Sequence, residues 1–93
     1  MATLHIEHPI TDYTTWRAAF DRFAEARERA GVTAHRVRRP DDDAHFIVVD
    51  LEFPDPESAH RFHGFLRENV WSNPESSPAL DGTPTARVLI DHD

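Results

Sequence analysis

Cysteine and lysine are both missing from this chain of 93 residues. Without cysteine the protein can form no disulfide, no thiolate nucleophile, no cysteine-ligated iron–sulfur cluster and no cysteine zinc site. Without lysine it can form no Schiff base with a carbonyl substrate. The chemistry that remains open depends on histidine, on carboxylates and on the ten basic residues, all of which are arginine.

Excess positive charge and long apolar runs are missing as well. The formal net charge is −7 and the arginines are spread along the chain, which argues against binding to nucleic acid. No apolar run approaches the roughly 20 residues of a membrane-spanning helix, and the N-terminus lacks the features of a signal peptide. We therefore expect a cytoplasmic protein without nucleic acid or membrane partners. Because no shift in composition divides the chain, we expect one domain over residues 1–93.

Four segments have the alternating or β-rich composition of strands: residues 3–8, 32–39, 45–53 and 85–91. The second is the weakest, because arginines and a histidine dilute its apolar pattern, and this suggests a sheet edge. One face of the predicted sheet carries the apolar side chains Leu4, Ile6, Ile47, Val49, Leu51, Val88 and Ile90.

Two amphipathic segments between these strands predict helices. Asp12 is placed to cap the first, which ends at Gly31, and Asp55-Pro56-Glu57 starts the second, which runs to about Asn69. The apolar stripe of the first helix is Tyr13, Trp16, Phe20, Phe23 and Ala24. That of the second is Ala59, Phe62, His63 and Leu66, with Phe65 at its margin. Prolines, Asn73, Asp81 and Gly82 indicate a loop over residues 71–84.

The order of elements is βαββαβ, which predicts an α+β ferredoxin-like fold: a four-stranded antiparallel sheet with both helices on one face. Two helices can cover only one face of such a sheet. The other face would carry His5, Phe46, Val48, Asp50, Arg87 and Leu89, with Glu7 and Glu52 beside them. This mixture is too apolar for water and too polar for a dry core. We therefore expect a second copy of the chain to cover it in a homodimer.

Three short motifs carry a resemblance to a known family. They are Asp12-Tyr13-x-x-Trp16, Phe53-Pro54-Asp55-Pro56-Glu57-Ser58-Ala59 and Gly82-Thr83-Pro84. With the order of elements, they resemble the dimeric α+β-barrel superfamily, and within it the small proteins similar to antibiotic-biosynthesis monooxygenases. The resemblance covers residues 3–91 and implies strand order 4-1-3-2 and a ligand cleft between helices and sheet. Because the motifs are caps and turns, they point to a fold rather than to an activity.

The superfamily implies several chemistries: cofactor-free oxidation of aromatic polyketides, haem degradation and lactone isomerisation. Haem-degrading members resemble one another in a strand-one asparagine, a strand-three tryptophan and a helix histidine. This chain has His5 and Glu7 on strand one and no tryptophan over residues 45–53, and only His63 could stand in for the helix histidine. The resemblance therefore favours the chemistry that needs no cofactor, on a small aromatic ligand.

His63 is the best single candidate for catalysis, because it lies on the apolar face of the second helix and would face the cleft. A neutral imidazole there could orient a ligand hydroxyl or act as a general base near pH 7. Alternatively, His63 is a structural histidine bonded to a backbone carbonyl.

Aromatic side chains are the candidates for ligand binding, since small-molecule sites are mostly apolar with a few polar anchors. They are Tyr13, Trp16, Phe62 and Trp71, with Phe20 beside them. Alternatively, aromatic residues at helical spacing belong to the core. Trp71 sits where the chain leaves the second helix and is the best placed to form a lid.

Polar residues of the second sheet face form a further candidate cluster. If the strand order of the family holds, His5, Glu7, Asp50 and Arg87 converge, and a carboxylate pair beside an imidazole could do acid–base work or bind a metal. Ion pairing across the strands in a dimer interface explains the same residues. Because no third ligand is identifiable beside His60 and His63, we expect no metal site.

Two functions remain open. The first is a cofactor-independent monooxygenase-like enzyme acting on an aromatic small molecule, which requires a cavity for a drug-sized molecule between helices and sheet. The second is a non-catalytic dimeric protein that binds a ligand or assists another protein. A reaction rate lost with His63→Ala would contradict the second.

Overall fold

The structure, a computed structural model, describes residues 1–92. Its elements are β1 (Ala2–Pro9), α1 (Tyr13–Arg22), α2 (Ala24–Arg29), β2 (Ala34–Arg38), β3 (Phe46–Phe53), α3 (Pro56–Phe65), the π-helical turn η1 (Leu66–Val70) and β4 (Thr85–Ile90). The predicted βαββαβ order and α+β class are confirmed. No helix within residues 1–92 is both long enough and apolar enough to span a membrane.

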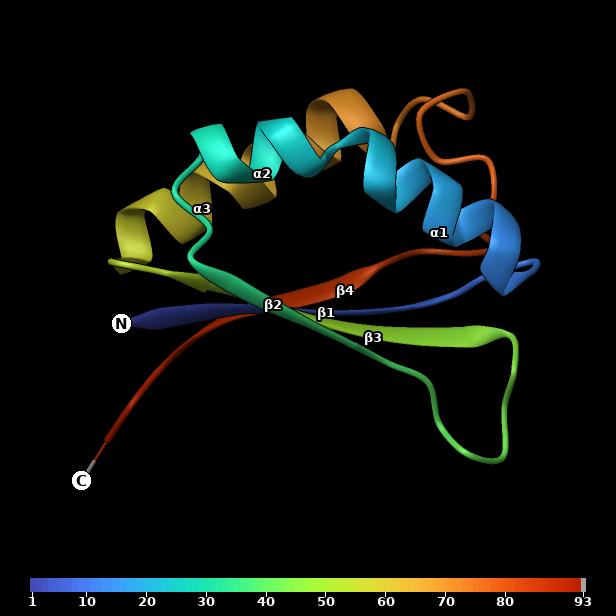
Figure 1. The fold of residues 1–93 in the computed structure, drawn as a ribbon, viewed down its shortest axis with the longest axis horizontal. Helices are drawn as coiled ribbons and strands as arrows, with labels where there is room; N and C mark the ends of the chain where they lie inside the picture. The colour runs from blue at the N-terminus through green and yellow to red at the C-terminus, as the bar shows by residue number, and fades with distance from the viewer. Residues whose placement is uncertain (93) are drawn as a thin grey trace.

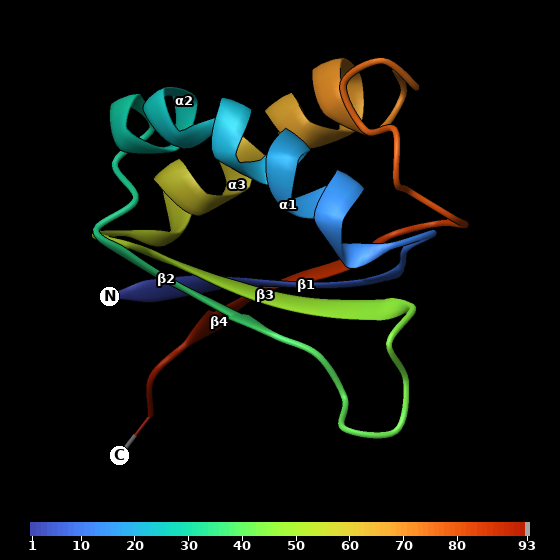
Figure 2. The ribbon, with the colours of Figure 1, turned by 45° about the vertical axis from the view of Figure 1, so that its right-hand side comes forward.

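The four strands form one antiparallel sheet in the order β2-β3-β1-β4, which is the order that the family resemblance implies. All helices lie over one face of this sheet (Figure 1). The loop between β2 and β3 and the C-terminal end project on the opposite side, as Figure 2 also shows. No helix within residues 1–92 covers that opposite face.

The core lies between the helices and the sheet. Alternate residues of β1 and β3 point toward the helices and are buried there: Ala2, Leu4, Ile6, His8, Ile47, Val49, Leu51 and Phe53. From above, Trp16 of α1 and Ala59 and Phe62 of α3 pack on them. The inward side chains of the strands and the aromatic side chains of the helices thus pack into one apolar layer, as their periodicities predict.

Both predicted helix starts are confirmed by their caps. The side chain of Asp12 accepts a hydrogen bond from the backbone N–H of Thr15 at 2.8 Å. Asp55 does the same with the N–H of Ser58, also at 2.8 Å, and Pro56 occupies the first turn, where it has no N–H to leave unpaired.

The prediction of one continuous first helix is wrong. The helix breaks at Phe23, whose φ of −97° and ψ of 14° lie outside the helical region, so that α1 and α2 are separate. The N–H of Phe23 bonds three residues back, to the carbonyl of Phe20 at 3.2 Å. Arg27 turns inward from α2 and donates to the same carbonyl at 2.5 Å. This long-range side-chain contact has no signature in the apolar pattern.

The second helical segment ends near Asn69, as predicted, but its last turn is π-helical rather than α-helical. After α3 the backbone widens into η1, where the N–H of Trp71 bonds to the carbonyl of Leu66, five residues back, at 2.7 Å. Such widened turns are rare and often occur at functional sites. The extra residue in the turn positions Val70 and Trp71 against the space between helices and sheet.

Two strands are shorter than predicted. The second spans only Ala34–Arg38 and the last ends at Ile90. Ile90 was expected in the core, but it is 54% exposed although it pairs with the buried Ala2. The pairing of β1 and β4 therefore extends to a residue that the core does not cover.

Candidate functional site

A cavity of about 80 Å³ lies between the helices and the sheet. Its lining comes from β1, β3, α1, α2, α3, η1 and the segment 71–80. A cavity needs roughly 10–15 Å³ to hold one water molecule, whereas pockets for drug-sized ligands measure about 300–1,000 Å³. At about 80 Å³ the cavity is too small for a drug-sized molecule, so the requirement stated above for the enzyme hypothesis is not met for a ligand of that size.

Aromatic side chains make up much of the cavity wall: Trp16, Phe20, Phe23, Phe62 and Trp71. The rings of Trp16 and Phe20 stack with centroids 4.9 Å apart, so this part of the wall is rigid and flat. Three of the four residues predicted to bind a ligand, Trp16, Phe62 and Trp71, therefore lie at one site.

Tyr13 lies outside the cavity lining. Its ring tilts against Trp16 at a centroid distance of 6.0 Å, and the guanidinium of Arg39 lies 4.6 Å from its centre. Tyr13 thus forms part of the outer layer that holds Trp16 in place.

His63 does not line the cavity either. It follows Phe62, and one residue along a helix turns about 100° around the axis, so Phe62 points inward while His63 lies half-buried at the margin. Its ring meets the edge of Trp71 at a centroid distance of 5.8 Å. Partial burial, and then the charges of Arg67 and His60, lower the pKa of His63. The expected position facing the cleft is thus not observed, and a role in catalysis stays a prediction.

His8 is the histidine that does line the cavity. The alternation that places Leu4 and Ile6 toward the helices continues to His8, which is 5% exposed. Its Nδ1 lies 3.0 Å from the carbonyl oxygen of Pro9 and must donate, because a carbonyl only accepts. Burial lowers the pKa of His8, although the bond to Pro9 acts in the opposite direction. The neutral ring therefore keeps its lone pair on Nε2, which bonds to no described residue.

The period-two pattern of β1 already contained the signal for His8. Continuing the alternation of Leu4 and Ile6 by one step places His8 on the covered face. Sequence reasoning missed it because a histidine at a strand end gives no sign of whether a helix or loop covers it.

Arg27 is the second polar side chain in the cavity wall that sequence reasoning missed. It is only 7% exposed, and its guanidinium carbon lies 3.6 Å from the centre of the Phe20 ring. Burial lowers the pKa of Arg27, but a guanidinium remains charged at any ordinary pH. The cavity therefore combines an aromatic wall, one neutral base and one fixed cation.

The segment after η1 closes one side of the cavity. Ser77 donates from its hydroxyl to the carbonyl of Val70 at 2.8 Å. Further along, the N–H of Thr11 bonds to the carbonyl of Ala79 at 2.9 Å, and Ile10 pairs with Leu80. The segment is thus attached both to the end of η1 and to the residues just after β1, close in sequence to His8.

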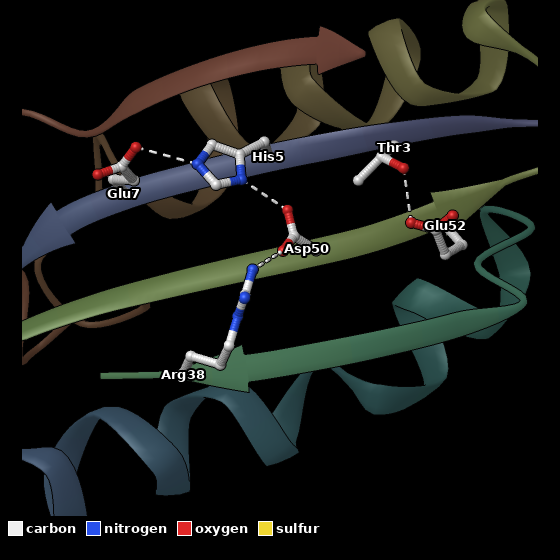
Figure 3. A network of polar contacts seen from close by, with 6 residues as sticks. All are labelled: Thr3, His5, Glu7, Arg38, Asp50 and Glu52. Carbon is white, nitrogen blue, oxygen red and sulfur yellow. Dashed lines mark hydrogen bonds and ion pairs between the residues drawn. The ribbon is translucent and has the colours of Figure 1, made fainter. Parts of the chain in front are cut away.

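On the opposite face of the sheet, a polar network connects three strands (Figure 3). His5 contacts Asp50 through Nδ1 at 2.6 Å and Glu7 through Nε2 at 3.0 Å. Arg38 donates to the other oxygen of Asp50 at 2.7 Å. The structure thus brings together His5, Glu7 and Asp50, while Arg87 lies opposite His5 in register and makes no ion pair with the described residues.

This network favours the charged form of His5. The hydrogen bond to Asp50 raises the pKa of His5, the bond to Glu7 adds to the effect, and partial burial opposes it. With both ring nitrogens donating to carboxylates, no lone pair is available for general base catalysis. Within residues 1–92, no three acidic or histidine side chains are grouped to hold a metal ion.

Apolar side chains lie beside this network on the same face. Phe46 and Val48 are half-buried, and Leu89 is 45% exposed. The six residues assigned to the dimer face thus occupy the face that no helix covers, on β1, β3 and β4.

Comparison with known proteins gives structural matches only. No protein-family model matches the chain, and neither does any curated protein sequence. SnoaB, described as a cofactor-independent oxygenase from Streptomyces nogalater, superposes with a TM-score of 0.73 over 99% of this chain and 93% of that one, at 18% identity. A protein described as an antibiotic biosynthesis monooxygenase gives 0.69 over the whole of both chains at 13% identity. A dimeric ferredoxin-like protein from an uncultured marine organism gives 0.61 over 99% and 97% at 12% identity.

At these identities the likeness establishes a fold and no activity. It confirms the resemblance carried by the caps and turns of the sequence. The chain has a ferredoxin-like α+β fold, which it shares with SnoaB and the antibiotic biosynthesis monooxygenase.

Proposed function

We propose that this protein is a cofactor-independent monooxygenase-like enzyme that binds a single-ring aromatic substrate in the cavity and uses His8 as its general base. The observation that carries the proposal is the buried imidazole of His8, whose pKa is lowered, in an apolar cavity wall of aliphatic and aromatic side chains. The oxygenase named among the structural neighbours supplies the reaction class.

The proposed reaction converts a phenol and O₂ into a quinone and water. Nε2 of His8 takes the phenol proton, which leaves an electron-rich ring. The phenolate passes an electron to O₂, and the two radicals combine at the ring carbon opposite the phenol oxygen. Breaking the O–O bond then leaves one oxygen atom on the ring and releases the other as water, with the ring hydrogen and the phenol proton. A positioned base contributes typically about 10²–10⁴-fold to such a step.

His8→Asn is the matched test of this role. The asparagine amide can still donate to the carbonyl of Pro9 in place of Nδ1, but nothing replaces the lone pair of Nε2. We expect oxygen uptake with a panel of single-ring phenols to fall at least about 100-fold in His8→Asn. With ¹⁸O₂, one labelled atom should enter each quinone made by the wild type.

His63→Asn is the control, because His63 lies outside the cavity. We expect its rate to stay within about twofold of the wild type. The reverse result, a loss in His63→Asn and none in His8→Asn, would assign the base to His63 as the sequence suggested. Binding of the phenols without oxygen uptake would instead support the non-catalytic ligand-binding alternative.

We further propose that the face without helices is covered by a second copy of the chain. The mixed face of Phe46, Val48 and Leu89 around the His5 network supports this, as does the dimeric state named for one structural neighbour. The β2–β3 loop and the C-terminal end project on this side and would flank the partner (Figures 1 and 2). Sedimentation at micromolar concentration should give twice the chain mass of 10.7 kDa, and a monomer would contradict the dimer.

A further inference from the structure

Arg27 is a buried cation without a carboxylate partner among the described residues. Its guanidinium bonds to the carbonyl of Phe20 and rests on the ring of the same residue, and neither partner carries a charge. The nearest acid on the preceding helix, Asp21, pairs with Arg17 at 3.2 Å. Charged side chains this deeply buried are normally paired.

The free donors of Arg27 are available to a ligand. A guanidinium has five N–H groups, and the Phe20 carbonyl uses one of them. Among the described residues, no fully buried side-chain nitrogen lacks a partner, so no Arg27 nitrogen is both fully enclosed and unbonded. Arg27 is also one of the residues that line the cavity of the proposed substrate site.

The guanidinium is also held in a fixed orientation. The Phe20 ring that supports it stacks on Trp16, which belongs to the same cavity wall. A planar ligand lying against these rings would bring an oxygen substituent within reach of Arg27, and little side-chain freedom would be lost on binding.

We propose that the cavity selects an aromatic ligand with an anionic oxygen, either a ring bearing a carboxylate or a phenol that ionises in the cavity, and that Arg27 binds its charged oxygen. This inference rests on the proposed function, because it assumes that the cavity takes an aromatic ligand. The inference specifies the charge of the ligand and names Arg27 as the residue that binds the charged group. Bound next to Arg27, a phenol would also give up its proton to His8 more readily.

A structural role for Arg27 is the competing explanation. Its bond to the Phe20 carbonyl stabilises the break between α1 and α2, where the N–H of Phe23 reaches the same oxygen. That role accounts for one N–H group and requires no charge on a ligand. The two explanations differ in what they predict for ligands that differ only in charge.

The first measurement uses the wild-type protein and a charge-matched pair, benzoate and benzamide, in titration calorimetry at neutral pH. We expect benzoate to bind at least about tenfold more tightly, as charge-assisted hydrogen bonds typically allow. Equal affinities would overturn the inference and leave the proposed function standing. If neither compound binds at millimolar concentration, both the proposed function and the inference fail.

The second measurement uses Arg27→Gln, with Arg29→Gln as control on the same helix, since the side chain of Arg29 is 77% exposed. We expect Arg27→Gln to remove the preference for benzoate and to change benzamide affinity less than about threefold. Arg27→Lys should keep part of the preference, because the charge remains. Equal losses for both ligands in Arg27→Gln and Arg27→Lys would show that Arg27 acts on structure alone.

Binding of 4-nitrophenol shows whether the site accepts ionised phenols or only carboxylates. Preferential binding of its yellow phenolate form by the wild type, lost in Arg27→Gln, would identify an ionised phenol as an accepted ligand. Binding of benzoate alone would restrict the site to carboxylates.

Discussion

His5 and His8 lie three residues apart on β1 and have opposite environments. His5 lies on the open face of the sheet between two carboxylates, and its pKa is raised. His8 lies under the helices with a carbonyl as its hydrogen-bond partner, and its pKa is lowered. Strand geometry alone separates them, since an odd spacing puts two residues on opposite faces. The same strand thus presents a histidine that favours its charged form on one face and a buried one that favours its neutral form on the other.

The largest expected effect comes from placing an aspartate on each face of β3 in turn, at the adjacent residues Val48 and Val49. Val49 is 4% exposed under the helices, so Val49→Asp buries an unpaired carboxylate and should lower the free energy of unfolding by about 3–5 kcal/mol in urea titrations. The neighbouring Val48 lies on the open face. Val48→Asp should keep the far-ultraviolet circular dichroism of the folded protein and shift its sedimentation to the monomer mass.

Each outcome of the valine pair is informative. A dimer that persists in Val48→Asp would show that the open face is not the interface. If both variants unfold to the same extent, the two faces of β3 do not differ in the way that the burial pattern indicates.

A smaller effect is expected from the carboxylates around His5. Asp50→Asn removes the main cause of the raised His5 pKa together with the charge that Arg38 contacts. The His5 pKa should fall back toward its ordinary range in an NMR titration, with a loss of about 1 kcal/mol in stability. Glu7→Gln is the control, because the side chain of Glu7 is 43% exposed and its bond to His5 is a lesser cause of the shift. A larger change from Glu7→Gln would contradict this ranking.

The smallest effects concern pH. His5 binds its proton more tightly in the folded protein, so its contribution to stability is fully present below about pH 6.5 and is lost as the pH rises through the folded pKa. For His8 the sign reverses, since the unfolded chain takes up a proton that the folded protein resists. Its contribution is lost as the pH falls below about 6.5 toward the lowered folded pKa.

NMR titration of the wild type should therefore place the two histidines on opposite sides of the ordinary value. In urea unfolding, His8→Asn should weaken the loss of stability at acid pH, and His5→Asn should weaken the loss at alkaline pH. Each slope should stay below about 1.4 kcal/mol per pH unit, the limit for a single proton. Coinciding titration curves would contradict the difference between the faces.

Much of the fold was predictable because its signals are local. Asp12 and Asp55 cap helices through residues three positions further on, and the alternation in β3 sorts its side chains between faces within a few residues. The open face with His5 and Asp50 follows from these patterns and from the strand order of the family.

The site was less predictable because its signals come from distant residues. Sequence spacing placed His63 on the apolar side of its helix, but the inward direction is occupied by Phe62. His8 is buried because the helices cover β1. Arg27 is buried beside the break at Phe23, where it bonds to the carbonyl of Phe20. Neither contact leaves a periodic mark in the sequence.

The sequence by itself determined the order of the elements, the caps and which side of each strand is apolar, because these depend on short-range sterics and hydrogen bonding. Only the tertiary structure decided which polar groups are enclosed in the cavity. Enclosure depends on how the helices, η1 and the segment 71–80 meet over the sheet. Burial there lowers the pKa of His8. Arg27 is enclosed at the same site with a backbone carbonyl, and no carboxylate, as its hydrogen-bond partner.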